Sequence, residues 1–133
     1  MRILGIIPAR FASTRFPGKP LAPIAGKTMI QRVYEQASQS ASLVDVIVAT
    51  DDERIYDAVS AFGGRAVMTD PVHPSGTDRC AEALHASGII SDAVINIQGD
   101  EPFISPHQID LVADVLKQGQ FSIATLVKVI QDE

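Results

Sequence analysis

Runs of apolar residues typical of strands alternate with helix-like repeats along the chain. Apolar or β-branched runs predict strands at residues 3–7, 44–49, 66–68, 93–97 and 121–130. Apolar positions spaced three or four residues apart predict helices at residues 29–37, 55–62, 77–86 and 106–118. The chain is therefore predicted to alternate between β and α elements over its whole length.

Signals for helix ends agree with this periodicity. Ser105 is a candidate N-cap of the last helix, Pro106 suits its first turn, and Gln108 completes the spacing of a capping box. Gly63 and Gly64 follow the second helix as a stop signal. Periodicity and end signals thus predict the same helices.

This alternation predicts an α/β fold with three layers, in which a mostly parallel sheet has helices on both faces. Ligands of such sheets bind beyond the carboxyl ends of the strands. The loops expected at those ends span residues 8–19, 50–53, 69–79 and 98–103, and they are the loops richest in Gly, Pro and charge. We therefore expect one composite site at this edge of the sheet.

The last predicted strand runs almost to the end of the sequence. A strand at the edge of a sheet exposes unpaired backbone groups unless another segment or subunit covers it. We therefore expect residues 1–133 to be part of a single domain that is truncated at its C-terminal end.

Composition narrows the class of protein without identifying it. The chain of 133 residues suits one domain, and a net charge of −5 disfavours general nucleic-acid binding. No apolar run is long enough to span a membrane, and the run at residues 3–7 is too short for a signal peptide. The single cysteine, Cys80, suits a reducing compartment, so we expect a cytoplasmic protein.

Positive charge is concentrated near the N-terminus, whereas all 16 acidic residues lie beyond residue 32. The cations of residues 1–32 are Arg2, Arg10, Arg15, Lys19, Lys27 and Arg32. Arg10, Arg15 and Lys19 lie in the loop at residues 8–19, whose Gly and Pro residues allow close approach of backbone N–H groups to a ligand. This pattern favours binding of a polyanion such as a triphosphate. The alternative is a solvated loop with ordinary surface charges.

The loop after the strand at residues 93–97 contains a candidate metal ligand. Asp100 would hold a Mg²⁺ ion that bridges protein and phosphate oxygens. The alternative is that Gly99 and Asp100 only form a turn.

The segment before the third helix is the other candidate binding loop. Ser75 or Thr77 would cap the helix, and capping alone would explain these residues. Alternatively, Arg79 and free N–H groups would contact a base or a sugar. His73 alone is more typical of a surface residue, and Asp51 after the second strand is a secondary candidate.

Other common motifs are missing from the sequence. Gly26-Lys27-Thr28 resembles the end of a P-loop, but Leu21 occupies the upstream position that requires glycine. No Gly-x-Gly-x-x-Gly follows the first strand, and no Ser-His-Asp or Cys-His arrangement is present. Cys80 is expected to pack on the third helix.

Taken together, these loops resemble those of the 3-deoxy-manno-octulosonate cytidylyltransferase (CMP-KDO synthetase) family. The matching segments are residues 6–10, 12–15, 17–21, 48–51, 68–69, 73, 75–79 and 98–102. The resemblance covers the whole chain in order, and Asp78 stands where many members have Glu. It implies a nucleotide-diphospho-sugar transferase-like fold, although the chain has only about half of the residues expected for the family.

The resemblance implies transfer of CMP from CTP to the anomeric hydroxyl of KDO, with release of pyrophosphate, for lipopolysaccharide biosynthesis. It implies catalytic roles for Arg10 and Lys19 on the triphosphate, and Mg²⁺ as a cofactor held by Asp100. The residues implied in nucleotide binding are Ala9, Arg10, Arg15, Lys19, Ser75, Gly76, Thr77, Arg79 and Gln98. At full length it implies a homodimer. The net charge and the lack of a long apolar run predict neither a nucleic-acid nor a membrane partner.

Two alternatives stay open. The first is a related nucleotidyltransferase with another acceptor, such as sialic acid or a sugar phosphate. The second is a non-catalytic, nucleotide-binding fragment of such an enzyme, either truncated or completed by a partner.

Overall fold

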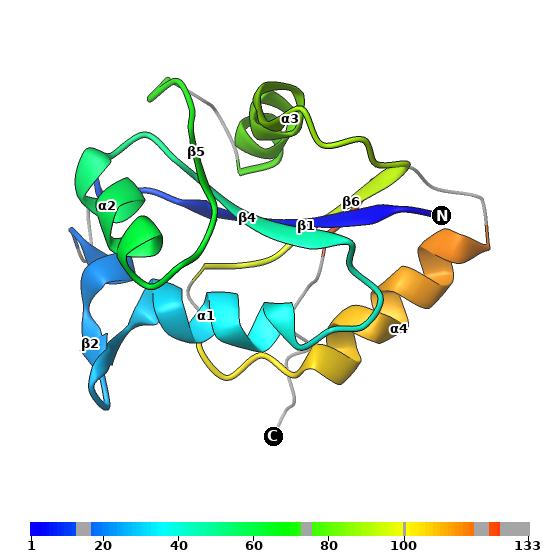
Figure 1. The fold of residues 1–133 in the computed structure, drawn as a ribbon, viewed down its shortest axis with the longest axis horizontal. Coiled ribbons are helices and arrows are strands. Elements are labelled where there is room, and N and C mark those ends of the chain that lie inside the picture. Colours follow the sequence, from blue (N-terminus) through cyan, green and yellow to red (C-terminus); the bar gives the residue numbers. More distant parts are fainter. Residues whose placement is uncertain (13–16, 73–75, 100, 119–122, 126–133) are drawn as a thin grey trace.

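The fold consists of a central parallel sheet with helices packed on it, as a computed structural model shows (Figure 1). The structure describes residues 1–12, 17–72, 76–99, 101–118 and 123–125. Its elements are β1 (Ile3–Ala9), the 3₁₀ helix η1 (Lys19–Leu21), β2 (Pro23–Ile24), β3 (Lys27–Thr28), α1 (Met29–Ser38), β4 (Asp45–Thr50), α2 (Glu53–Ala61), β5 (Ala66–Met68), α3 (Gly76–Ser87), β6 (Ala93–Asn96), α4 (Pro106–Lys117) and β7 (Ile123–Thr125).

Among the described residues, the main sheet has the strand order β5-β4-β1-β6-β7, and every neighbouring pair is parallel. The predicted parallel sheet is therefore confirmed. The strand predicted at residues 121–130 is confirmed at β7, and the rest of that range lies outside the described residues.

The side chains of β1 alternate between the two faces of the sheet. Ile3 and Ile7 belong to a core cluster shared with α1, α2 and α4, whereas Leu4 and Ile6 belong to a second cluster shared with α3. Because neighbouring residues of a strand point to opposite faces, one apolar run can contribute to both clusters. Helices thus cover both faces, as predicted, with α3 lying opposite α1 and α4 (Figure 1).

The predicted helix ends are largely confirmed. Ser105 caps α4, and both hydrogen bonds of the capping box with Gln108 are present. Gly63 follows α2 with a φ of 85°, the conformation that ends many helices. Thr77, a candidate cap of α3, instead lies inside that helix, because the helix already begins at Gly76.

A short hairpin, β2–β3, is the main element that periodicity does not predict, since each of its strands has only two residues. Its turn contains Ala25 with a φ of 52°, a left-handed conformation that is costly for a residue other than glycine. Arg32 donates hydrogen bonds to the carbonyl oxygens of Ile24 and Ala25 at 3.0 and 2.6 Å. These two bonds hold the turn in place.

Within the part of the chain that the structure describes, no helix is long and apolar enough to cross a membrane.

Candidate functional site

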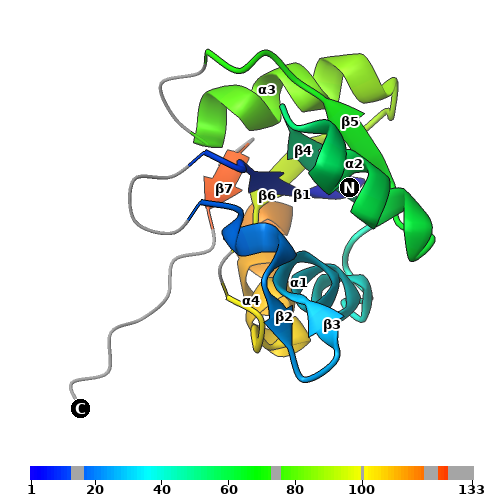
Figure 2. The same cartoon turned by 90° about the vertical axis from the view of Figure 1, so that its left-hand side faces the viewer.

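The carboxyl ends of the strands meet at the left-hand side of Figure 1, which Figure 2 turns toward the viewer. In the register of the sheet, Ala9 at the end of β1 pairs with Thr50 of β4, and Thr50 pairs with Met68 of β5. Asn96 ends β6 beside β1. The loops that were predicted to form one site therefore leave the sheet along the same edge.

Two glycines bring neighbouring loops against the end of β1. A Cβ atom on Gly99 would lie 2.9 Å from the carbonyl oxygen of Pro8, and one on Gly76 would lie 3.3 Å from Cγ of Pro8. Both distances are shorter than ordinary van der Waals contact. The start of α3 and the loop after β6 thus both pack on Pro8, which places predicted site residues of three segments at one point of the edge.

The first loop is closed at its base by a backbone hydrogen bond. The N–H of Gly18 donates to the carbonyl oxygen of Phe11 at 2.7 Å, and Gly18 has a φ of 75°. Lys19 follows directly as the first residue of η1. The position of Lys19 therefore depends on the closed base of this loop.

The cations near the N-terminus divide into those that lie outside the predicted binding loop and those that lie in it. Lys27 forms an ion pair with Glu35 at 2.8 Å, Arg32 holds the β2–β3 turn, and the Nε atom of Arg2 donates to the carbonyl oxygen of Ile90. The concentration of charge is therefore partly structural. Of the cations in the predicted loop, Arg10 is exposed at the end of β1 and Lys19 is partly buried.

Arg79 is buried at the start of α3, with only 1% of its surface exposed. Its Nη1 atom donates to Oγ1 of Thr69 at 2.6 Å and to the carbonyl oxygen of Asp70 at 3.3 Å. Its Nη2 atom lies 3.8 Å from a carboxylate oxygen of Asp51. Arg79 thus ties α3 to the ends of β4 and β5, and direct contact between Arg79 and a nucleotide stays a prediction.

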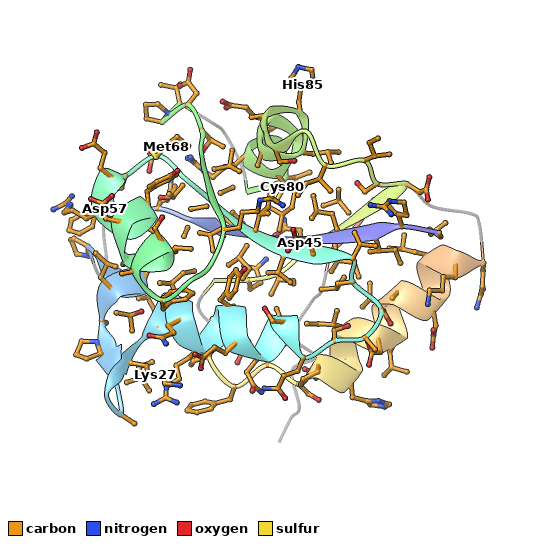
Figure 3. All side chains as sticks on the ribbon, in the orientation of Figure 1. Lys27, Asp45, Asp57, Met68, Cys80 and His85 are labelled. Atoms are coloured by element: carbon orange, nitrogen blue, oxygen red, sulfur yellow. The ribbon has the colours of Figure 1, made fainter. Side chains whose placement is uncertain are left out.

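A small cavity of about 100 Å³ lies between α3 and β6, and Thr77 and Cys80 are among its lining residues. Cys80 faces the sheet, whereas His85 on the same helix points away from it (Figure 3). Burial raises the pKa of the Cys80 thiol to about 12, so this thiol stays protonated at neutral pH. Cys80 therefore packs in the core, as predicted.

Asn96 also lines this cavity, and our sequence analysis did not single it out. It is 4% exposed, and its Oδ1 atom accepts no hydrogen bond from any residue that the structure describes. A buried acceptor without a donor is costly, which marks the residue as unusual. The signal in the sequence would have been a polar residue inside the otherwise apolar run at 93–97.

Four of the candidate site residues, including the predicted metal ligand, fall outside the part of the chain that the structure describes. Asp100, Arg15, Ser75 and His73 lie outside the described residues. Among the residues with described positions, no group of three His, Cys, Asp or Glu side chains is arranged to hold a metal ion. Of the other predicted nucleotide-binding residues at this edge, Gly76, Thr77 and Gln98 are exposed, whereas the side chains of Ala9 and Arg79 are buried.

This arrangement defines an α/β fold of the nucleotidyltransferase kind, with its loops gathered at the carboxyl edge of the sheet. A solved structure of CMP:2-keto-3-deoxy-manno-octonic acid synthetase complexed with CTP superimposes with a TM-score of 0.85 and 48% sequence identity, over 90% of this chain and 48% of that one. The fold prediction is thereby confirmed.

Sequence comparison identifies the family. The cytidylyltransferase family pattern matches residues 4–133, so the chain belongs to the cytidylyltransferase family. It is 60% identical over 128 residues to a 3-deoxy-manno-octulosonate cytidylyltransferase of Bacteroides thetaiotaomicron. This match covers 96% of this chain and 50% of the Bacteroides protein. It is 53% identical over 129 residues to an 8-amino-3,8-dideoxy-manno-octulosonate cytidylyltransferase of Shewanella woodyi. That match covers 95% of this chain and 53% of the Shewanella protein. The chain thus spans about half the length of these relatives.

Proposed function

We propose that this chain is the nucleotide-binding part of an enzyme that transfers CMP from CTP to the anomeric hydroxyl of KDO and releases pyrophosphate. The observation that carries the proposal is the packing of the first loop, the start of α3 and the loop after β6 around the end of β1. The 60% identity to a KDO cytidylyltransferase supports the choice of nucleotide and acceptor.

In this proposal, cations of the first loop act on the triphosphate. Arg10 directly follows β1 and Lys19 begins η1, so the two cations lie at opposite ends of the loop. The hydroxyl of the acceptor attacks the α-phosphorus, and negative charge develops on the departing pyrophosphate. Arg10, Lys19 and Arg15 would offset this charge, which is how positioned cations accelerate such displacements.

The start of α3 and the loop after β6 would hold the nucleoside part. Gly76 is exposed at the first turn of a helix of 12 residues, whose N–H groups point to the carboxyl edge of the sheet. Ala9, Ser75, Thr77 and Gln98 would complete this part of the site. Arg79, held by Thr69 and Asp51, would fix the start of α3.

The cofactor in this proposal is Mg²⁺. Asp100 follows Gly99 in the sequence, and Gly99 packs on Pro8 at the start of the proposed triphosphate loop. A carboxylate supplies the hard oxygen donors that Mg²⁺ prefers. Asp100 would be the ligand. When bound, Mg²⁺ would neutralise charge on the phosphate oxygens.

The cellular compartment, the pathway and the oligomeric state of the enzyme are part of the same proposal. The single cysteine is consistent with the cytoplasm, and the product would serve lipopolysaccharide biosynthesis. A homodimer at the length of the relatives is expected from the family resemblance.

The acceptor could instead be 8-amino-3,8-dideoxy-manno-octulosonate. The 53% identity to a cytidylyltransferase named for that sugar supports this second candidate. The two acceptors differ at C8, where one has a hydroxyl and the other an amine. Product formation with both sugars in competition, using the protein at the length of its relatives, would separate the two candidates.

Calorimetric titration with Mg·CTP tests nucleotide binding by the chain itself, with Mg·UTP and Mg·ATP as controls. We expect selective binding of CTP. Lys19→Ala should weaken binding strongly and, in any longer form that turns over, lower turnover by at least ~100-fold. Lys27→Ala is the matched control, because Lys27 lies in the β2–β3 hairpin, outside the first loop. Equal binding of all three nucleotides would refute the proposed specificity.

A further inference from the structure

The aromatic ring of Phe11 is held between two other parts of the chain. The Cζ atom of Arg54 lies 3.3 Å from the centroid of the ring. On another side, a Cβ atom added to Gly18 would lie 2.9 Å from Cε2 of the ring, so Phe11 packs directly on the Gly18 backbone. A guanidinium group stacked on an aromatic ring is attracted by the ring's negative face.

Phe11 forms one end of the base of the first loop. Its carbonyl oxygen accepts the hydrogen bond from the N–H of Gly18, and Lys19 is the next residue. Both the backbone and the ring of Phe11 therefore contact Gly18. A group that fixes the ring also fixes the point at which the chain enters η1.

Arg54 is itself fixed at the start of α2. Its Nε and Nη2 atoms donate to the two carboxylate oxygens of Asp52 at 3.1 and 2.8 Å. Asp52 is the N-cap of α2 and also accepts a hydrogen bond from the backbone N–H of Arg54 at 2.8 Å. This bidentate pairing orients the plane of the guanidinium group, which a lysine could not reproduce.

We propose that Arg54, anchored by Asp52 and stacked on Phe11, is a positioning residue that holds the base of the first loop where Lys19 can meet the phosphates of a nucleotide. The inference rests on the proposed function for its nucleotide. It adds α2, more than 30 residues further along the sequence, to the elements that build the site. Arg54 acts through Phe11 and Gly18 and needs no contact with the ligand.

The chain provides a matched control for a surface ion pair. Arg65 pairs with Asp45 at 2.7 Å, and its side chain is 53% exposed, compared with 61% for Arg54. Asp45 begins β4, at the opposite end of that strand from Thr50. Arg65→Leu thus removes a comparable ion pair without changing the base of the first loop.

The test measures two quantities in Arg54→Leu, Arg54→Lys, Phe11→Leu and Arg65→Leu. The first is the affinity for Mg·CTP, and the second is the hydrogen-exchange rate of the Gly18 amide. We expect Arg54→Leu to weaken binding by roughly 3- to 10-fold, the scale of one cation–π contact. We expect its Gly18 amide to exchange faster, with a denaturation midpoint matching that of Arg65→Leu. Arg54→Lys should restore part of both losses.

A double-mutant cycle separates this role from general destabilisation. The effects of Arg54→Leu and Phe11→Leu on affinity should be less than additive, because each removes the same stack. Additive effects, wild-type affinity in Arg54→Leu, or an equal loss in Arg65→Leu would overturn the proposal. If the wild-type chain binds no nucleotide, the proposed function fails. The exchange rate of the Gly18 amide then tests the inference by itself. Unchanged exchange in Arg54→Leu refutes it, and faster exchange supports the role of Arg54 in holding the base of the first loop.

Discussion

Two arginines support the same edge of the sheet in opposite ways. Arg79 at the start of α3 is buried and has protein partners on two strand ends, whereas Arg54 at the start of α2 is largely exposed and lies on the ring of Phe11. A buried guanidinium that loses its partners is costly, while an exposed ion pair contributes little to stability. The comparison teaches that stability and positioning of the site can rest on different residues.

The largest expected effect is on stability at the α3 side. Arg79→Met removes the hydrogen bond to Thr69 and leaves Asp51 without its cation, so we expect the free energy of unfolding to fall by about 3 kcal/mol. Urea denaturation would measure this fall. Arg65→Met, which removes an exposed pair, should cost less than about 1 kcal/mol. Equal losses in the two variants would contradict the contrast between buried and exposed arginines.

Whether an interaction could be predicted from the sequence depends on how far apart its residues lie along the chain. The capping box of Ser105 and Gln108 lies within four residues, so the sequence alone indicates it. The stack of Arg54 on Phe11 joins residues far apart in the chain, and no local pattern indicates it. Burial of Arg79 was likewise not predictable, because arginine side chains are seldom buried without specific partners.

The composite site shows the same division. Parallel strands must end at one edge, so the positions of Ala9, Gly76 and Gln98 near that edge follow from the predicted fold. The concentration of positive charge indicated the candidate site residues less well than the fold did. Lys27 and Arg32 belong to the cationic N-terminal part of the sequence, but their partners in the fold are Glu35 and the β2–β3 turn.

Two glycine-to-alanine substitutions should have intermediate effects on stability, and they compare the packing of the first loop with that of the α3 side. Gly18→Ala places a Cβ 2.9 Å from the Phe11 ring and forces alanine to a φ of 75°, so we expect a loss of about 1–2 kcal/mol of stability. The Cβ of Gly76→Ala would meet Cγ of the Pro8 side chain at 3.3 Å and Nδ2 of Asn96 at an ordinary 3.8 Å, so this change should cost less than about 1 kcal/mol. Thermal or urea unfolding would compare them. A costlier Gly76→Ala would show that the α3 side is the more tightly packed one.

The smallest expected effect concerns pH. The side-chain hydrogen bonds from Arg54 lower the pKa of Asp52 below its ordinary value of 3.8. Stability from this pair is therefore present above the unfolded-state pKa and is lost as the pH falls through the lowered folded-state value. Asn can still cap α2, so Asp52→Asn should cost well under about 1 kcal/mol at neutral pH, and this deficit should vanish in acid.

Urea denaturation of Asp52→Asn at pH 7 and in acid below the folded-state pKa of Asp52 would check this pH dependence. Asp57→Asn, on the same helix and outside this ion pair, is the matched control. A deficit that is the same at both pH values would mean that Asp52 contributes as a helix cap and not through its charge.

The most direct test of the proposed nucleotide site is to map backbone amide chemical shifts during titration with Mg·CTP. We predict that the shifts concentrate at the carboxyl edge of the sheet, at Ala9, Gly18, Gly76, Gln98 and their neighbours. The opposite edge, at Arg2, Asp45 and Asp92, should not respond. Saturable shifts centred on that opposite edge, or no shifts at the carboxyl edge, would contradict the account.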